Sequence, residues 1–335
     1  RASWTARYAS ASTRCTCDAG TRLGRVRVIF AGTPDVALPS LRAIVDAGHQ
    51  VVGVLTRPDA PAGRGRKLAA SPVAALAESL GLPVLKPERP DDTLVATVAG
   101  LHAEVAAVVA FGMLLPQALL DAVPRGWVNL HFSLLPRWRG AAPVQRAILA
   151  GDAVSGVTTF RIVRQLDAGP IYRSMQVPIG AAETSGELLT RCAELGGPVL
   201  VDSLADVAAG VEPVPQSSAG VTLAPKIRPD DVRIDWTQPA RQIDLLVRAA
   251  NPAPVAWTML DGQRFQVLKV APGERSGPSL TPGELAADRR HLWAGTGSAD
   301  LQLVEVKAFG RKPMAGVDWA RGRQGGLNPG TRFDG

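Results

Sequence analysis

Cysteine and histidine are scarce in the sequence, and their positions exclude two common kinds of site. Of the three cysteines, Cys15 and Cys17 lie near the N-terminus and only Cys192 lies in the body of the chain. A single cysteine can build neither a disulfide framework nor a cysteine-based zinc site. Three of the four histidines are scattered without the spacing of metal ligands. We therefore expect no metal.

Long apolar runs and nucleotide-binding glycine motifs are also missing. No apolar stretch approaches the roughly 20 residues that a membrane-spanning helix needs, so we expect no membrane partner. The turn after the first expected strand reads AGTPD rather than G-x-G-x-x-G, which argues against a nicotinamide cofactor. The stretch RPDAPAGRGRKL at 57–68 lacks the spacing of a nucleotide P-loop, although it concentrates glycine and basic residues.

The apolar content that is present predicts a well-packed α/β protein. The 335 residues are 46% hydrophobic with a mean hydropathy of +0.08, and the chain is long enough for two domains. From Val26 onward, short apolar strands alternate with helices, such as the strand expected at 50–56 and the helix expected at 71–80. This alternation predicts an α/β fold with a doubly wound, largely parallel sheet.

Composition divides the chain into four parts. Residues 1–25 are rich in Arg and Ser and fit no domain, so we expect an extraneous or disordered extension. Residues 26–208 hold the alternating pattern of the main domain, and the Pro-, Gly- and Ser-rich residues 209–225 are expected to be a linker. Residues 226–335 contain several short strands and an Asp-Gly hairpin turn at 261–262, which predict a small β-barrel domain.

The net charge of +7 is unevenly distributed along the chain. Residues 1–25 carry a net charge of +4, and residues 226–335 carry 16 basic and 12 acidic residues. Residues 26–225 carry a net charge of −1. A basic module attached to a near-neutral body favours a polyanionic partner, although an ordinary solvated surface is an open alternative at so modest a charge.

The most informative stretch is VNLHFSLLPRWRGAAP at 128–143. It begins as a strand, and side chains two apart in a strand point the same way, so Asn129 and His131 should leave the sheet together. An amide and an imidazole supply hydrogen-bond donors that suit an oxyanion. Asp167 follows in RQLDAGP, a turn between two expected strands, where an Asp commonly does no more than cap the backbone.

The 128–143 stretch and the LDAG sequence at 166–169 together resemble the formyltransferases that use 10-formyltetrahydrofolate, and SLLPRWRGAAP resembles the branch that acts on methionyl-tRNA. The resemblance implies a Rossmann-like formyltransferase domain followed by an OB-like C-terminal domain. It also implies transfer of the formyl group of 10-formyltetrahydrofolate, the co-substrate, to the α-amino group of methionine on initiator tRNA. By the same resemblance, Asn129 and His131 stabilise the oxyanion, and Asp167 orients His131 and relays a proton.

The resemblance further assigns residues to the two substrates. The pterin of the folate is expected between two strand-end turns, and the residues assigned to it are Phe111, Gly112, Ser133, Leu134, Leu135 and Pro136. The basic 57–68 loop is expected beside the acceptor end of the tRNA, and a further contact is expected in the C-terminal domain. The residues assigned to tRNA are Arg57, Arg64, Arg66, Lys67 and Lys226.

Two other functions stay open. A formyltransferase acting on a small amine, such as glycinamide ribonucleotide or an amino sugar, would share the N-x-H pair and the Asp without needing the basic loop or the barrel. A non-catalytic RNA-binding protein would explain the basic barrel but would leave Asn129, His131 and Asp167 without a role. We expect a monomer in the bacterial cytoplasm rather than the mitochondrion, because residues 1–25 lack the apolar helix face of a transit peptide.

Overall fold

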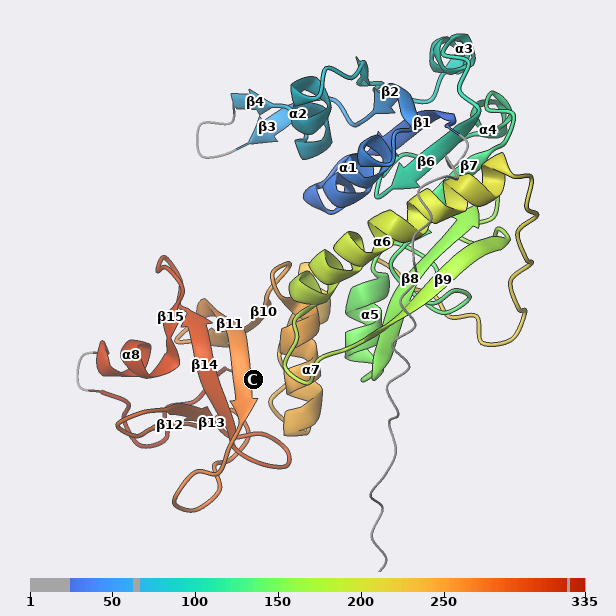
Figure 1. Ribbon diagram of the computed structural model, residues 1–335. Helices are drawn as coiled ribbons and strands as arrows, with labels where there is room; N and C mark the ends of the chain where they lie inside the picture. The colour runs from blue at the N-terminus through green and yellow to red at the C-terminus, as the bar shows by residue number, and fades with distance from the viewer. Residues whose placement is uncertain (1–24, 63–66, 324–325, 335) are drawn as a thin grey trace, which may run out of the picture.

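The computed structural model describes residues 25–62, 67–323 and 326–334 (Figure 1). Two sheets account for most of its strands, and each has its own buried core. Most of the extension expected at 1–25 lies outside the described residues, as do Arg64 and Arg66.

The first sheet has seven strands, of which the first five in spatial order run parallel. The last two strands are antiparallel to their neighbours, which the sequence pattern did not reveal. In spatial order the strands are β5 (Val84–Leu85), β2 (Gln50–Leu55), β1 (Arg27–Gly32), β6 (Val105–Val109), β7 (Trp127–His131), β8 (Val154–Arg161) and β9 (Ile171–Pro178).

Helices cover both faces of this sheet, because its central strands are apolar on both sides. One face is packed against α1 (Leu38–Asp46), α2 (Pro72–Ser79), α5 (Pro143–Leu149) and α6 (Ser185–Ala208). The other face is packed against α3 (Asp92–Gly100) and α4 (Gln117–Asp121). The expected doubly wound, largely parallel α/β sheet is therefore confirmed.

The second sheet is a curled antiparallel sheet, in agreement with the small barrel-like domain expected after residue 226. Its core includes an aromatic cluster in which Trp236 stacks on Phe333 with ring centroids 4.9 Å apart. Its elements are η2 (Pro229–Val232), α7 (Ala240–Ala250), β10 (Ala256–Leu260), β11 (Gln263–Pro272), β12 (Leu285–Ala287), β13 (Leu292–Ala294), β14 (Leu301–Lys307), β15 (Met314–Ala315) and α8 (Gly316–Arg321).

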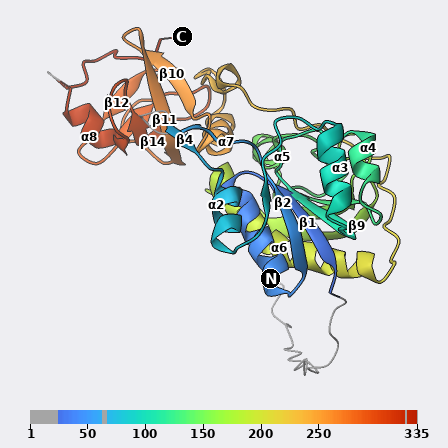
Figure 2. The same ribbon diagram turned by 90° about the horizontal axis from the view of Figure 1, so that it is seen from above.

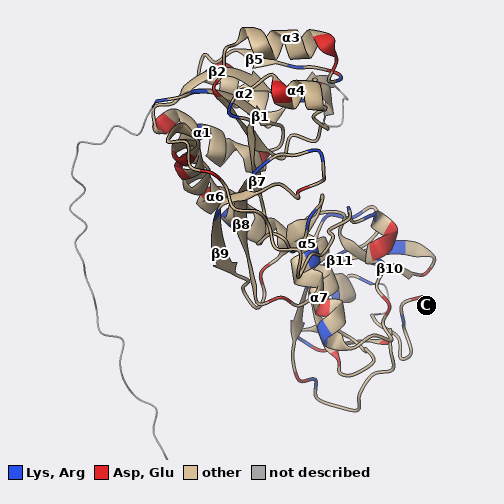
Figure 3. Ribbon diagram, turned by 90° about the vertical axis from the view of Figure 1, so that its right-hand side faces the viewer, with Lys and Arg blue, Asp and Glu red and all other residues tan. Residues whose placement is uncertain are grey.

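The two sheets meet through helices. Helix α7 lies against α5, which keeps the second sheet beside one end of the first (Figures 1 and 2). The Ser185 hydroxyl at the start of α6 donates to the carbonyl oxygen of Asn251 at 2.8 Å, directly after α7. Helix α7 carries charges of both signs (Figure 3), and Arg248 pairs with Asp244 at 2.9 Å. The C-terminal part is thus fastened to the first sheet by packing and by specific hydrogen bonds.

The sequence pattern predicted no regular structure for two segments. Both form short backbone pairings of the β type. Within the 57–68 loop, β3 (Ala60–Ala62) and β4 (Lys67–Ala69) form an antiparallel pair. In the segment 209–225, Val214 bridges to Ile171, and Leu223 bridges to Arg139. The second segment therefore runs along the first sheet before it enters the C-terminal part.

Candidate active site

Strand β7 carries the two polar side chains of the central motif. Asn129 lies between Val108 on the parallel strand β6 and Phe160 on the antiparallel strand β8. Leu130, between the two polar residues, is only 1% exposed and belongs to the core. Alternation along the strand therefore gives Asn129 and His131 a common side, and both line the same cavity.

His131 is held in one orientation by the chain that follows it. Its Nε2 atom lies 2.8 Å from the carbonyl oxygen of Trp138, which can only accept a hydrogen bond, so Nε2 carries a proton. Its Nδ1 atom lies 3.8 Å from Oδ2 of Asp167. Burial lowers the pKa of the imidazole, and the nearby Asp167 carboxylate opposes this effect only in part. The resting His131 is therefore neutral, with a lone pair on Nδ1 facing Asp167.

Asp167 reaches His131 from the loop between β8 and β9. Its backbone has a φ of 46°, in the left-handed region that Asp adopts more readily than most residues. Its Oδ2 atom accepts a hydrogen bond of 2.8 Å from the backbone N–H of Gly140. The side chain is 16% exposed, so the carboxylate is screened from bulk water but borders the cavity.

Two glycines allow the loops of the site to approach each other. Gly140 has a φ of 125°, and a Cβ there would lie 2.8 Å from the carbonyl oxygen of Ala224. At Gly169, a Cβ would lie 1.7 Å from the carbonyl oxygen of Arg161. A larger residue at Gly169 would therefore displace the loop that carries Asp167.

The cavity itself has a volume of about 620 Å³ and a largely apolar lining. The expected residues Phe111 and Gly112 line it together with Asp167, and Leu114 and Leu166 line it while remaining 84% and 59% exposed. An apolar slot with a few convergent polar groups is the usual form of a small-molecule site. The lining residues are 108, 110–115, 129–132, 140, 141, 143, 160, 162–164, 166 and 167.

The four residues 133–136 lie beside this cavity rather than in its lining. The Ser133 hydroxyl donates to the carbonyl oxygen of Arg137 at 2.7 Å, and the Thr158 hydroxyl donates to the carbonyl oxygen of Ser133 at 2.7 Å. The backbone N–H of Leu135 donates to the Thr158 hydroxyl oxygen at 3.2 Å. Ser133, Leu134, Leu135 and Pro136 thus shape the turn that carries Trp138 and Gly140, and their contact with the folate stays a prediction.

The residues expected to contact tRNA are spread over both parts of the chain. Arg57 and Lys226 are exposed, and Lys67 begins strand β4. Arg64 and Arg66 lie outside the described residues. The structure therefore leaves the assignment of this set to tRNA as a prediction.

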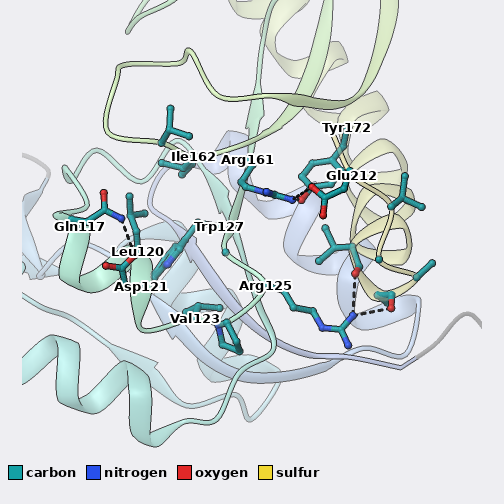
Figure 4. A pocket seen from close by; sticks show the side chains of 18 of the residues that line it. Gln117, Leu120, Asp121, Val123, Arg125, Trp127, Arg161, Ile162, Tyr172 and Glu212 are labelled. Atoms are coloured by element: carbon teal, nitrogen blue, oxygen red, sulfur yellow. Dashed lines mark hydrogen bonds and ion pairs between the residues drawn. The ribbon is translucent and has the colours of Figure 1, made fainter. Parts of the chain in front are cut away.

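A second and larger cavity, of about 810 Å³, lies near the start of β7 and the end of α6 (Figure 4). Two of its three cations, Arg125 and Arg161, already have partners within the protein. Arg125 donates to the carbonyl oxygens of Val207 and Ala208 in the last turn of α6, and Arg161 donates to Tyr172 and Glu212. The smaller cavity, by contrast, contains the expected residues Asn129, His131 and Asp167.

Neither a metal centre nor a membrane segment is found in the described ranges. No group of three or more His, Cys, Asp or Glu residues there could hold a metal ion. No helix of the same ranges is long and apolar enough to cross a membrane.

Comparison with known protein families gives matches to both parts of the chain. Residues 24–204 match the model described as formyl transferase, and residues 226–324 match the model described as formyl transferase, C-terminal domain. A protein of Cutibacterium acnes named methionyl-tRNA formyltransferase is 52% identical over 322 residues, which cover 92% of this chain and 100% of that protein. A protein of the same name from Nocardioides sp. is 50% identical, over 92% of this chain and 99% of its own length.

Solved structures of low sequence identity share the fold. An N-formyltransferase from Helicobacter canadensis, solved with folinic acid and dTDP-3-aminofucose, is 16% identical with a TM-score of 0.63, over 85% of this chain and 100% of that one. HypX from Aquifex aeolicus, solved with tetrahydrofolic acid, is also 16% identical, with a TM-score of 0.62 over 88% of this chain. The match covers 47% of the HypX chain, so this chain spans about half of that protein.

Proposed function

The chain belongs to the formyl transferase family, and on that premise we propose that it transfers the formyl group of 10-formyltetrahydrofolate to the α-amino group of methionine on initiator tRNA. The product is formylmethionyl-tRNA, which serves translation initiation. Identities of about 50% to bacterial proteins named methionyl-tRNA formyltransferase, over nearly their whole length, support this substrate over a small amine.

The observation that carries the proposed chemistry is the convergence of Asn129, His131 and Asp167 on one cavity. Among the described residues, the structure gives the Asn129 side-chain amide no hydrogen-bond partner, so its donors are available to a substrate. His131 and Asp167 lie beside it with their own partners in place. An amide donor, an imidazole and a carboxylate at one apolar slot are the groups that acyl transfer to an amine requires.

The cavity also fits the co-substrate of this family, 10-formyltetrahydrofolate. A pterin is a flat ring system with hydrogen-bonding edges, and the slot between the 110–115 turn and the 162–167 loop offers apolar side chains together with backbone groups. We assign Phe111 and Gly112 to the wall of this slot, with Ser133, Leu134, Leu135 and Pro136 behind it. The bound folate supplies the activated formyl group.

Formyl transfer then proceeds by direct attack. As the methionine nitrogen bonds to the formyl carbon, the carbonyl oxygen becomes an oxyanion, to which the Asn129 amide donates. One such donor is typically worth about 3 kcal/mol of transition-state stabilisation. Asp167 accepts the proton that the amine loses and relays it, directly or through water, to N10 of the folate. The bond from N10 to the formyl carbon breaks as N10 is protonated.

The orientation of His131 decides how it contributes. Its Nε2–H is donated to Trp138, so it can donate to the oxyanion only through Nδ1, which requires the imidazolium form. Asp167 passes the proton of the attacking amine to Nδ1 while the tetrahedral intermediate lasts, and the same proton returns through Asp167 to N10 as the intermediate collapses. The Asp167 carboxylate then stabilises the imidazolium that faces it. His131 therefore rests neutral and becomes a donor as the tetrahedral intermediate forms.

We further assign the negatively charged tRNA to the basic residues of both parts of the chain. The acceptor end of the tRNA is proposed to contact the basic loop residues Arg57, Arg64, Arg66 and Lys67. Lys226 is proposed to contact the sugar-phosphate backbone further along the tRNA. The proposed setting is a monomer in the bacterial cytoplasm, consistent with the bacterial sources of the relatives.

Transfer of a radiolabelled formyl group from 10-formyltetrahydrofolate tests this function. Purified initiator Met-tRNA is the substrate, and uncharged initiator tRNA and glycinamide ribonucleotide are the controls. Rapid labelling of the charged tRNA alone is expected. Labelling of glycinamide ribonucleotide alone would assign the protein to small amines, and labelling of none of the three would contradict the proposed reaction.

A further inference from the structure

The side chain of Gln216, in the segment between the two parts of the chain, is hydrogen-bonded to both loops of the active site. Its Nε2 atom donates to the carbonyl oxygen of Asp167 at 2.8 Å and to that of Gly169 at 2.7 Å. Its Oε1 atom accepts from the guanidinium of Arg139, with distances of 3.1 Å to Nε and 2.6 Å to a terminal nitrogen. One amide therefore uses both of its donors and its acceptor on the residues around the site.

These hydrogen bonds form a closed network around the carboxylate of Asp167. Gln216 holds the backbone of Asp167, the Asp167 carboxylate accepts from the backbone of Gly140, and Arg139, the neighbour of Gly140, donates back to Gln216. This closed set of hydrogen bonds holds the Asp167 carboxylate in two ways, through its own backbone and through the loop that carries Arg139 and Gly140. Loss of Gln216 would leave the contact with Gly140 but release the backbone on which it depends.

The loop around Asp167 needs such an anchor. Gln165 and Leu166 are exposed, and the backbone of Asp167 is in the left-handed region. A residue in that region costs about 1 kcal/mol or more and persists only when its surroundings hold it. The two carbonyl groups that Gln216 binds lie on either side of Ala168, so the amide spans the part of the loop that sets the direction of Asp167.

The segment that carries Gln216 is itself fastened to the other loop. The hydroxyl of Thr222 accepts a hydrogen bond of 2.8 Å from the backbone N–H of Trp138, whose carbonyl oxygen binds His131. The backbone of Arg139 pairs with residues 222 and 224, at 2.9 Å and 2.7 Å. This segment therefore supports the positions of both His131 and Asp167 before it enters the C-terminal sheet.

We propose that Gln216 is a positioning residue, which holds the Asp167 carboxylate in place for proton relay in the formyl transfer reaction. Gln216 does not line the cavity and has no charge, so it acts through Asp167 and not on the substrate. The proposal rests on the function proposed above. It goes beyond that function in making the segment 209–225 part of the catalytic apparatus.

The test compares Gln216→Ala, Gln216→Glu and the matched control Ser218→Ala. Ser218 is exposed and lies two residues away on the same segment. The glutamate variant, assayed where it is ionised, keeps the acceptor for Arg139 but has lost both donors and places a negative charge against two carbonyl oxygens. It therefore keeps the segment attached while removing the bonds to the Asp167 loop.

We expect Gln216→Ala and Gln216→Glu each to lower kcat about 10- to 100-fold, because a displacement near 1 Å of a reacting group can cost this much. The KM values for folate and tRNA should change less than about threefold, which marks a loss confined to the transition state. Ser218→Ala should match the wild type. Thermal melting curves recorded by circular dichroism establish that each variant is folded at the temperature of the assay.

A second readout does not depend on turnover. Because the Asp167 carboxylate raises the pKa of His131 against the effect of burial, a displaced Asp167 should lower the titration midpoint of His131 observed by NMR. Both Gln216 variants should show this shift, and Ser218→Ala should not.

Three outcomes would overturn the proposal. Unchanged kcat in Gln216→Ala would do so, as would a loss found only in the KM for tRNA, which would make Gln216 a tRNA contact. Full activity of Gln216→Glu would show that the bond to Arg139 alone matters. If the wild type does not formylate Met-tRNA, the proposed function fails, while the His131 titration still decides whether Gln216 positions Asp167.

Discussion

Nε2 of His131 lies 2.8 Å from the carbonyl oxygen of Trp138. This contact settles the tautomer of a residue that could otherwise present either nitrogen to a substrate. The proton on Nε2 is engaged with the protein, so only Nδ1 is left to exchange a proton or to contact a substrate. Trp138 is seven residues away in sequence and has a φ of 62°, which turns the chain back toward the strand end.

We predict that His131 at neutral pH is the neutral tautomer with its proton on Nε2, and that it titrates at a midpoint below the usual value near 6.5. Burial disfavours the charged form, so the imidazole of His131 binds its second proton at a lower pH than that of an exposed histidine. Long-range ¹H–¹⁵N correlation spectra of the ring nitrogens measure both properties. With four histidines in the sequence, His131→Asn identifies the signal.

Asp167→Asn provides the matching test of the coupling between the two residues. Because the Asp167 charge raises the pKa of His131, its removal should move the midpoint to still lower pH. His49 is another buried histidine whose pKa is lowered by burial, and its midpoint should not move in this variant. A proton on Nδ1, or an upward shift of the His131 midpoint in Asp167→Asn, would contradict the assigned geometry.

Asn129→Ala should lower kcat by about 10² to 10³, which is the usual effect of removing one oxyanion donor. In the proposed mechanism the amide donates to the reacting oxygen and not to the tRNA, so the affinity for Met-tRNA should be nearly unchanged. Steady-state formylation assays measure the rate, and filter binding measures the affinity. Turnover equal to that of the wild type would remove Asn129 from the mechanism.

The fold around this site was largely predictable from the sequence. The hydrophobic periodicity and the residues that mark the ends of helices indicate the same elements. Helix α6 begins at Ser185 and ends at Ala208. Thr184 and Glu187 form a capping box at its start, a signal that can be read directly from residue types and spacing. The shared side of Asn129 and His131 followed equally from strand alternation.

Other features depend on contacts between distant segments, for which one sequence carries no local signal. Strands β3 and β4 have three residues each and are defined by their pairing with each other. Nothing in the composition of the segment 209–225 distinguishes a free linker from one whose Gln216 joins two loops. The placement of Ser133 behind the cavity likewise depends on Thr158, a residue of the neighbouring strand.

Gly169→Ala should destabilise the protein by about 1–3 kcal/mol and also reduce activity. The added Cβ would meet the backbone carbonyl oxygen of Arg161, which cannot move without disturbing β8, so the loop that carries Asp167 must shift. Urea unfolding measures the free energy, and formylation of Met-tRNA measures the activity.

Gly100→Ala is the control for that substitution. Gly100 is the last residue of α3, and a Cβ there would have no heavy atom within 4 Å. Alanine favours a helix more than glycine does, so this variant should be as stable as the wild type or slightly more stable. Equal stability of Gly169→Ala and the wild type would show that the Asp167 loop is less tightly enclosed than the structure indicates.

Cys192 should be inert in the folded protein. The residue lies on the buried face of α6, and burial raises the pKa of its thiol to about 11. The thiolate is the reactive form, so near pH 8 both access and ionisation oppose modification. In a variant with Cys15→Ser and Cys17→Ser, Ellman's reagent should release no colour from the native protein and one equivalent after unfolding in urea. Rapid labelling of the native variant would mean that α6 opens readily, which is incompatible with a rigid support for the sheet that carries Asn129 and His131.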